Sequence, residues 1–105
     1  MASSNNYLAY ILDQLSLLDG ITHRAMMGEF ILYKDKKIFG GIYDDRFLVK
    51  PTKSAMEKMP KAPHELPYEG AKEMLLVEDV DNREFLRELV TAMWKELPEA
   101  KTRKK

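Results

Sequence analysis

The side chains best suited to acid–base or metal chemistry are two histidines, and their placement favours neither role. His23 and His64 stand far apart in the sequence, so they do not form the i, i+4 pair that lets two imidazoles on a helix bind one metal. His23 has Arg24 beside it, but the sequence identifies no nucleophile or carboxylate partner for it. We therefore expect structural or solvent-exposed histidines, no catalytic residues and no metal site.

Other residues that could support catalysis also lack the necessary context. No glycine-rich loop leads from a strand into a helix, and Gly40 and Gly41 lack the spacing of a phosphate-binding loop. The acidic groups at residues 44–45 and 78–81 suit a turn and a helix start. No serine stands in a GxSxG turn: Ser3, Ser4, Ser16 and Ser54. We expect a protein that is not an enzyme and has no cofactor.

The composition points to a cytoplasmic protein. The absence of cysteine excludes disulfides, thiolate zinc sites and a cysteine nucleophile, and it suits a reducing compartment. Residues 1–20 have neither the basic start of a signal peptide nor a continuous apolar run, because Asp13 and Gln14 interrupt the apolar positions. We expect no membrane span and no membrane partner.

Charge is balanced overall and uneven along the chain. Lys and Arg number 17, as do Asp and Glu, so no global positive field attracts nucleic acid. Residues 22–61 hold nine basic and five acidic side chains, whereas residues 62–98 hold four basic and nine acidic ones. Two solvated faces of opposite sign explain this asymmetry, and a functional patch is the alternative.

Apolar spacing predicts the helices that must position these residues. One stripe predicts a helix over residues 5–18: Leu8, Ile11, Leu12, Leu15 and Leu18. Ser4 or Asn5 can cap this helix, and Gly20 can end it. A wider stripe predicts a helix over residues 82–97, with Asp81 and Glu84 forming its capping box. We expect a shared core that includes Leu12, Leu15, Phe85, Leu89 and Trp94.

Short aromatic and β-branched runs between the helices predict strands. Three runs stand out at residues 30–33, 38–43 and 47–50, with a short strand before them at residues 23–27 and one more at residues 74–77. Residues 34–37 and 44–45 are short enough for tight antiparallel turns. Gly40 and Gly41 indicate a bulge or the close approach of a helix, with a ligand near the backbone as the alternative. After Pro51, Thr52 or Ser54 can cap a short helix at residues 52–59.

This order of elements predicts an α+β fold of two layers, in which an antiparallel β-sheet packs against N- and C-terminal helices and a short helix lies between strands. With 105 residues, the chain has room for one core. We expect a single domain over residues 1–105, with a flexible basic tail at residues 99–105.

A series of residues between positions 21 and 50 is recognisable: Thr22, Arg24, Met26, Met27, Gly28, Phe30, Tyr33, Ile38, Phe39, Asp44 and Asp45. Together with the leading helix and the later run from Pro67 to Gly70, this series resembles the N-terminal domain of the TfoX/Sxy family. Two departures stand out. Residues 27–29 read Met-Gly-Glu where the family commonly has Phe-Gly-Gly, and Lys36 stands where glycine is frequent.

The resemblance implies a helix leading into a curled antiparallel sheet. It also implies a role in bacterial natural competence, where TfoX/Sxy acts as a coactivator with the cyclic-AMP receptor protein. The full regulator has a second, C-terminal domain, so we expect a stand-alone copy of the first domain. The family supplies no catalytic residues.

Three classes of function follow. The leading hypothesis is a protein-interaction module in the regulation of competence or transcription, whose protein partner, for example a transcription regulator, docks on the basic strand region: Arg24, Lys34, Lys36, Lys37, Arg46 and Lys50. A solvated sheet edge protected by lysines is the alternative explanation of these residues. Direct nucleic-acid binding through them and the tail comes second, although the balanced charge argues against specific DNA binding by the isolated domain. A small-molecule enzyme is the least favoured, and a homodimer stays open.

Overall fold

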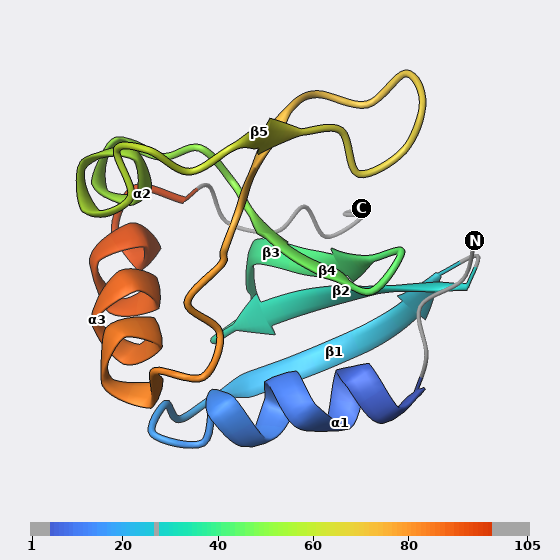
Figure 1. Cartoon of the computed structure of the whole chain (residues 1–105). Helices are drawn as coiled ribbons and strands as arrows, with labels where there is room; N and C mark the ends of the chain where they lie inside the picture. Colours follow the sequence, from blue (N-terminus) through green and yellow to red (C-terminus); the bar gives the residue numbers. More distant parts are fainter. Residues whose placement is uncertain (1–4, 27, 98–105) are drawn as a thin grey trace, which may run out of the picture.

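The computed structural model describes residues 5–26 and 28–97 and shows an α+β fold (Figure 1). Its elements in chain order are α1 (Asn5–Gln14), β1 (Ile21–Met26), β2 (Glu29–Lys34), β3 (Lys37–Tyr43), β4 (Arg46–Val49), α2 (Lys53–Lys58), β5 (His64–Glu65), β6 (Met74–Leu76) and α3 (Arg83–Trp94). The strands form one sheet in the order β1-β2-β3-β4-β6-β5, and every neighbouring pair is antiparallel. The predicted fold class is confirmed, and β5 is an additional short strand.

Both long helices cover the same face of the sheet. Ile42 lies opposite Phe30 on one side and Phe47 on the other, so these three side chains share a face. The same buried cluster contains three residues of the N-terminal segment and four of α3: Leu8, Ile11, Leu15, Leu86, Leu89, Val90 and Met93. The core therefore lies between the sheet and the two helices.

The predicted shared core is confirmed for two residues and corrected for one. Leu15 and Leu89 are buried, and Leu12 and Phe85 pack against the core at its margin. Trp94 was expected in the core, but it is only partly buried because its indole Nε1 donates a hydrogen bond to the backbone oxygen of Lys34 at 2.9 Å. A polar atom that needs a partner keeps this ring at the junction between α3 and the hairpin of β2 and β3.

The N-terminal helix is shorter than the 5–18 prediction. It ends at Gln14, after which Ser16 N donates to Asp13 O at 3.1 Å and Leu18 N donates to Leu15 O at 3.0 Å. These i to i−3 bonds tighten the chain into turns that satisfy the carbonyl groups at the helix end. The apolar stripe continues through the turns, which explains why spacing alone overestimated the helix. Ser4, one of the two predicted caps, lies outside the described residues.

Two hairpins turn as tightly as predicted. Asp35 and Lys36 have φ values of 47° and 74°, and Asp44 and Asp45 have values of 54° and 55°. Positive φ at both central residues is the geometry that matches the twist of the adjoining strands. Lys36 therefore occupies a left-handed position, which gives a physical reason for the glycine frequently found there in proteins that this sequence resembles.

The two glycines of β3 allow close approach of backbone and of an aromatic ring. The register shifts between Leu32 and Tyr33, so the predicted bulge is present. A Cβ at Gly40 would collide with the backbone oxygen of Leu48, and one at Gly41 would lie 2.7 Å from Cε2 of Tyr43. The neighbours are thus strand backbone and a ring, so the bulge holds, and a helix, the other explanation considered, is not among the nearest atoms.

Capping was predicted correctly for the short helix and wrongly for the last one. Thr52 accepts a hydrogen bond from Ala55 N at 3.1 Å and caps α2. At α3 the cap is Asn82 and not Asp81, since Asn82 Oδ1 accepts from Phe85 N at 3.0 Å. Asn82 has the extended backbone that a cap requires, so the helix begins one residue later than the acidic pattern indicated.

Candidate functional site

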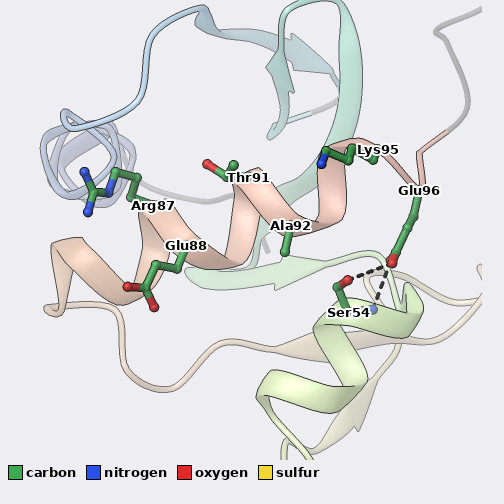
Figure 2. Close-up of a pocket in the computed structure, with 7 residues that line it drawn as sticks. All are labelled: Ser54, Arg87, Glu88, Thr91, Ala92, Lys95 and Glu96. Atoms are coloured by element: carbon green, nitrogen blue, oxygen red, sulfur yellow. Dashed lines mark hydrogen bonds between the residues drawn. The ribbon is translucent and has the colours of Figure 1, made fainter.

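A shallow groove of about 690 Å³ runs beside α3 and the start of α2 (Figure 2). Glu96 reaches across one end of it, where Oε1 accepts from the backbone N of Ser54 at 2.9 Å and Oε2 accepts from Ser54 Oγ at 2.7 Å. These hydrogen bonds, led by the one from the backbone, lower the pKa of Glu96. The carboxylate is occupied by this contact, so we interpret this end of the groove as a structural junction.

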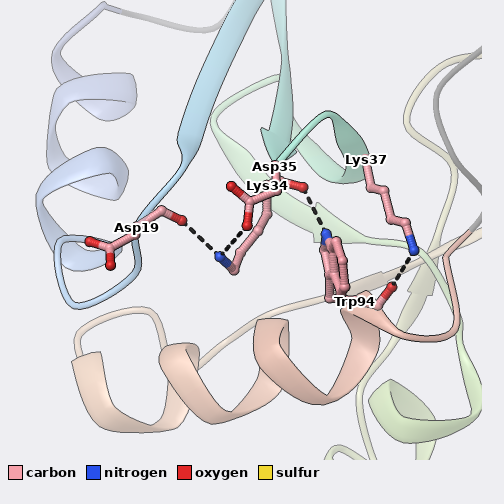
Figure 3. A network of polar contacts seen from close by, with 5 residues as sticks. All are labelled: Asp19, Lys34, Asp35, Lys37 and Trp94. Atoms are coloured by element: carbon pink, nitrogen blue, oxygen red, sulfur yellow. Dashed lines mark hydrogen bonds and ion pairs between the residues drawn. The ribbon is translucent and has the colours of Figure 1, made fainter.

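Two of the predicted basic residues join the β2–β3 hairpin to neighbouring segments, Lys37 to the end of α3 and Lys34 to the segment after α1 (Figure 3). Lys37 Nζ lies 4.1 Å from the centroid of the Trp94 ring and donates to Trp94 O at 3.2 Å. Lys34 Nζ donates to Asp19 O at 2.8 Å and pairs with the Asp35 carboxylate at 3.0 Å. A cation near the last carbonyl groups of a helix is favourable, as is one over an indole face. Both ammonium groups already have structural roles.

Arg46 lies at the other end of the sheet, in the hairpin between β3 and β4. Its Nη1 pairs with Glu65 at 2.6 Å, and its Nη2 donates to the backbone oxygen of Leu66 at 3.2 Å. Its Nε donates to Tyr43 O at 3.1 Å. The guanidinium thus fastens β5 and the start of the following loop to the sheet.

The side chains of the remaining basic candidates have no hydrogen bond or ion pair within the described part of the chain. Arg24 is exposed on β1, Lys36 is exposed at the tip of the β2–β3 turn, and Lys50 is partly buried after β4. The six candidates are therefore spread over several places and do not form one patch. Their role in partner binding stays a prediction.

Strand β1 forms a margin of the sheet, because among the described residues it has a strand neighbour on one side only. Five of its six residues are exposed, from Thr22 to Met26. His23 and Ala25 lie on the face that the helices cover elsewhere, since they pair with Leu32 and Phe30 of the core. Their exposure indicates that neither long helix buries these side chains, although α1 runs alongside β1 (Figure 1).

A pocket of about 590 Å³ opens on the opposite face of the sheet, beneath the loop between β5 and β6. Tyr43 alternates with the core residue Ile42, so its ring lies on the face away from the helices. The Tyr43 and Tyr68 ring centroids are 6.2 Å apart with planes inclined by 54°. Lys50 and Gly70 are also part of the lining.

Burial changes the acid–base behaviour of two groups in this pocket. It is the main cause that raises the pKa of Tyr43, with the neighbouring Tyr68 contributing next. It also lowers the pKa of Lys50, for which no opposite charge compensates within the described residues. The pocket therefore combines aromatic walls with an ammonium group that has lost part of its hydration.

Each histidine contacts a neighbouring side chain. His23 packs edge-on against Phe30 at a centroid distance of 6.1 Å, and His64 Nδ1 lies 3.5 Å from a carboxylate oxygen of Glu73 at the surface. Across residues 5–26 and 28–97, no three His, Cys, Asp or Glu side chains gather as a metal site would require. Over the same residues, no helix has the length and apolar character needed to cross a bilayer.

Comparison with known proteins identifies the family. A family model of the TfoX N-terminal domain matches residues 13–97. The chain belongs to the TfoX N-terminal domain family. The resemblance noted from residues 21–50 is thereby confirmed, and the match extends over the whole sheet, α2 and α3.

This TfoX N-terminal domain is also similar to a curated protein. An uncharacterised 12.7 kDa protein in the trpE 5′ region of Spirochaeta aurantia is 34% identical over 107 aligned residues, which cover 99% of this chain and 91% of that protein. No solved structure matches the chain. The comparisons thus give family membership without assigning a role to individual residues.

The pocket beneath the β5–β6 loop was missed by sequence reasoning. In the sequence, the run from Pro67 to Gly70 supports only the family resemblance, and Lys50 is only one of several basic residues. The Gly40–Gly41 pair was the one sequence signal for this region, because two glycines in a strand let a neighbouring group or a ligand approach the backbone of β3. Gly40 lines the pocket, and Gly41 makes room for the Tyr43 ring.

Proposed function

We propose that this TfoX N-terminal domain is a non-enzymatic protein-interaction module in the regulation of transcription, and that its partner docks on the free margin of strand β1. The observation that carries the proposal is the exposure of β1 along nearly its whole length. The outer side of an edge strand presents a row of backbone N–H and C=O groups to which an extended segment of another protein can bind. The family suggests competence regulation as the setting.

The charges on β1 favour a partner that differs from this chain. The strand reads Ile-Thr-His-Arg-Ala-Met and contains no acidic residue. Antiparallel pairing of two copies would bring the two Arg24 side chains near each other, which is unfavourable on one sheet surface. A partner segment with acidic side chains complements Arg24, so we expect a heterologous complex and a monomeric free domain.

A catalytic role has less support. Three of the six basic candidates are held in internal contacts, His23 packs against the Phe30 ring, and His64 faces the Glu73 carboxylate at the surface. The charged side chains described above mostly stabilise junctions between elements. The exposed strand is the better basis for a function.

Site-specific photo-crosslinking in the native host tests the proposal. A benzophenone amino acid replaces Thr22 on β1 in one variant and Arg87 on the exposed side of α3 in the control. We expect the Thr22 variant to give one dominant adduct with a transcription regulator, with the cyclic-AMP receptor protein as the first protein to examine by mass spectrometry. The Arg87 variant should give none.

The same experiment can contradict each part of the proposal. A dominant adduct from Arg87 alone would move the docking surface to α3. A single Thr22 adduct with a protein outside transcription would keep the surface and overturn the regulatory role. A dimer of this chain, seen as a Thr22 self-adduct and by light scattering, would overturn the heterologous partner.

A further inference from the structure

Lys50 is a charged group that the fold leaves uncompensated. Its ammonium is partly buried beside the pocket under the β5–β6 loop, and it has no hydrogen bond or ion pair within the described residues. Removing a charge from water without a partner is unfavourable, and burial accordingly lowers the pKa of this lysine. An anion bound in the pocket would restore the missing interaction.

The walls of the pocket suit a flat apolar group. Tyr43 is buried with its ring against Gly41, whereas Tyr68 beside it is 57% exposed. An exposed aromatic ring on a loop, next to a buried one, leaves a face on which another ring can pack. The volume of about 590 Å³ falls within the range of small-molecule sites.

The charge of the lining favours a single negative charge on the ligand. Lys50 and Lys72 contribute positive charge, and Glu73, whose side chain is 63% exposed, contributes a negative one. A phosphate dianion is usually bound by a guanidinium fork or by several N–H groups at a helix start. The lining has neither an arginine nor a helix start, so a carboxylate fits better than a phosphate.

We propose that this pocket binds a small planar aromatic monocarboxylate, with its ring against Tyr68 and Tyr43 and its carboxylate paired with Lys50 Nζ. This site lies on the face of the sheet away from the helices and is separate from the strand margin proposed for the protein partner. Lys50 supplies the charge selectivity, and the two tyrosines supply the packing surface.

Chemical-shift titration of the ¹⁵N-labelled full chain tests this site. The probes are benzoate, indole-3-carboxylate and naphthalene-2-carboxylate, with indole-3-carboxamide as a neutral control and inorganic phosphate as a control for the anion. We expect saturable shifts at the amides of Gly40, Gly70 and Ala71 with at least one carboxylate. We expect about tenfold weaker binding of the carboxamide, as the loss of one charge-assisted hydrogen bond implies.

Variants assign the two parts of the site. Lys50→Met keeps the aliphatic stem and should weaken carboxylate binding about tenfold while leaving carboxamide binding unchanged. Tyr68→Ala should weaken both, and Lys72→Met, at the exposed rim, should change carboxylate affinity less than about twofold. A dispersed spectrum like that of the wild type confirms that each variant is folded.

Several outcomes would overturn the proposal. These are the absence of saturable binding by all three carboxylates, equal affinity for the carboxamide, tighter binding of phosphate, and a folded Lys50→Met variant that binds carboxylates like the wild type. Shifts confined to other parts of the domain would overturn the location.

Discussion

Glu96 and Ser54 are separated by 42 residues in sequence and joined by two hydrogen bonds, of 2.9 Å to the backbone N and 2.7 Å to Oγ (Figure 2). The same carboxylate therefore satisfies an amide at the start of α2 and holds that helix to the segment after α3. Because both bonds require the ionised carboxylate as acceptor, they tie the stability of this junction to pH.

The first prediction concerns that pH dependence. Hydrogen bonds from Ser54 hold the pKa of Glu96 in the folded chain below its ordinary value of 4.5. The stabilisation is therefore fully present above the unfolded pKa and is lost as the pH falls through the folded pKa. We expect Glu96→Gln to be less stable than the wild type at neutral pH, with a gap that narrows below about pH 4.5. Urea denaturation across this pH range measures it.

Glu88→Gln is the matched control for this measurement, since Glu88 lines the same groove and its side chain has no hydrogen bond or ion pair in the described residues. The difference in unfolding free energy between Glu88→Gln and the wild type should not narrow in the same way as the pH falls. A Glu96→Gln gap that stays constant down to pH 3 would show that the carboxylate contributes nothing specific.

The second prediction compares two leucines of the helix stripes. Leu89 is 0% exposed, whereas Leu12 is only partly buried at the margin of the core. Leu89→Ala should lower the free energy of unfolding by about 2–5 kcal/mol, because truncation leaves a cavity. Leu12→Ala should lower it by about 1–2 kcal/mol, as less apolar surface is involved. Equal losses in chemical denaturation would contradict the burial difference.

The third prediction uses the left-handed residue of the β2–β3 turn. Lys36 has a φ of 74°, a conformation that costs an L-residue more than it costs glycine. We expect Lys36→Gly to raise the free energy of unfolding by about 0.5–1 kcal/mol after the entropy of glycine is included. Arg87→Gly, within α3, should lower it by about 1 kcal/mol. Chemical denaturation measures both changes, from the shift of the midpoint when the dependence of the unfolding free energy on denaturant concentration is unchanged. A destabilised Lys36→Gly variant would refute the turn geometry.

The fourth prediction is that the isolated domain does not bind DNA specifically. The apolar faces of both long helices lie in the core, and the outer side of α3 carries charges of both signs, such as Arg87 and Glu88. Residues 62–98 contain nine acidic and four basic side chains, which repel a duplex laid across them. A gel shift at about 150 mM salt should give equal, weak binding to competence-promoter and scrambled duplexes. Tight binding that prefers the promoter would reverse this expectation.

The sequence by itself determined most of the elements, because their signals are local. The apolar stripes around Leu8 and Leu89 identified both long helices, and the paired polar residues at Asp44 and Asp45 identified a tight hairpin. Thr52 was recognised as a cap since its hydroxyl bonds an amide only three residues away. The predictions were wrong where one local pattern is compatible with two backbone conformations. At the end of α1, the apolar stripe fits both an α-helix and the tighter turns that are present.

Only the tertiary structure decided the roles of the basic and aromatic side chains. Lys37 and Trp94 lie 57 residues apart, and Arg46 and Glu65 lie 19 apart, so their contacts depend on how the bulged sheet curves against α3 and on which strand adjoins β4. The pocket likewise exists because a loop from residues 66–73 passes over Tyr43 and Lys50. Hydrogen bonding and apolar burial act over a few ångströms, and side chains distant in sequence come within that range only when the chain has folded.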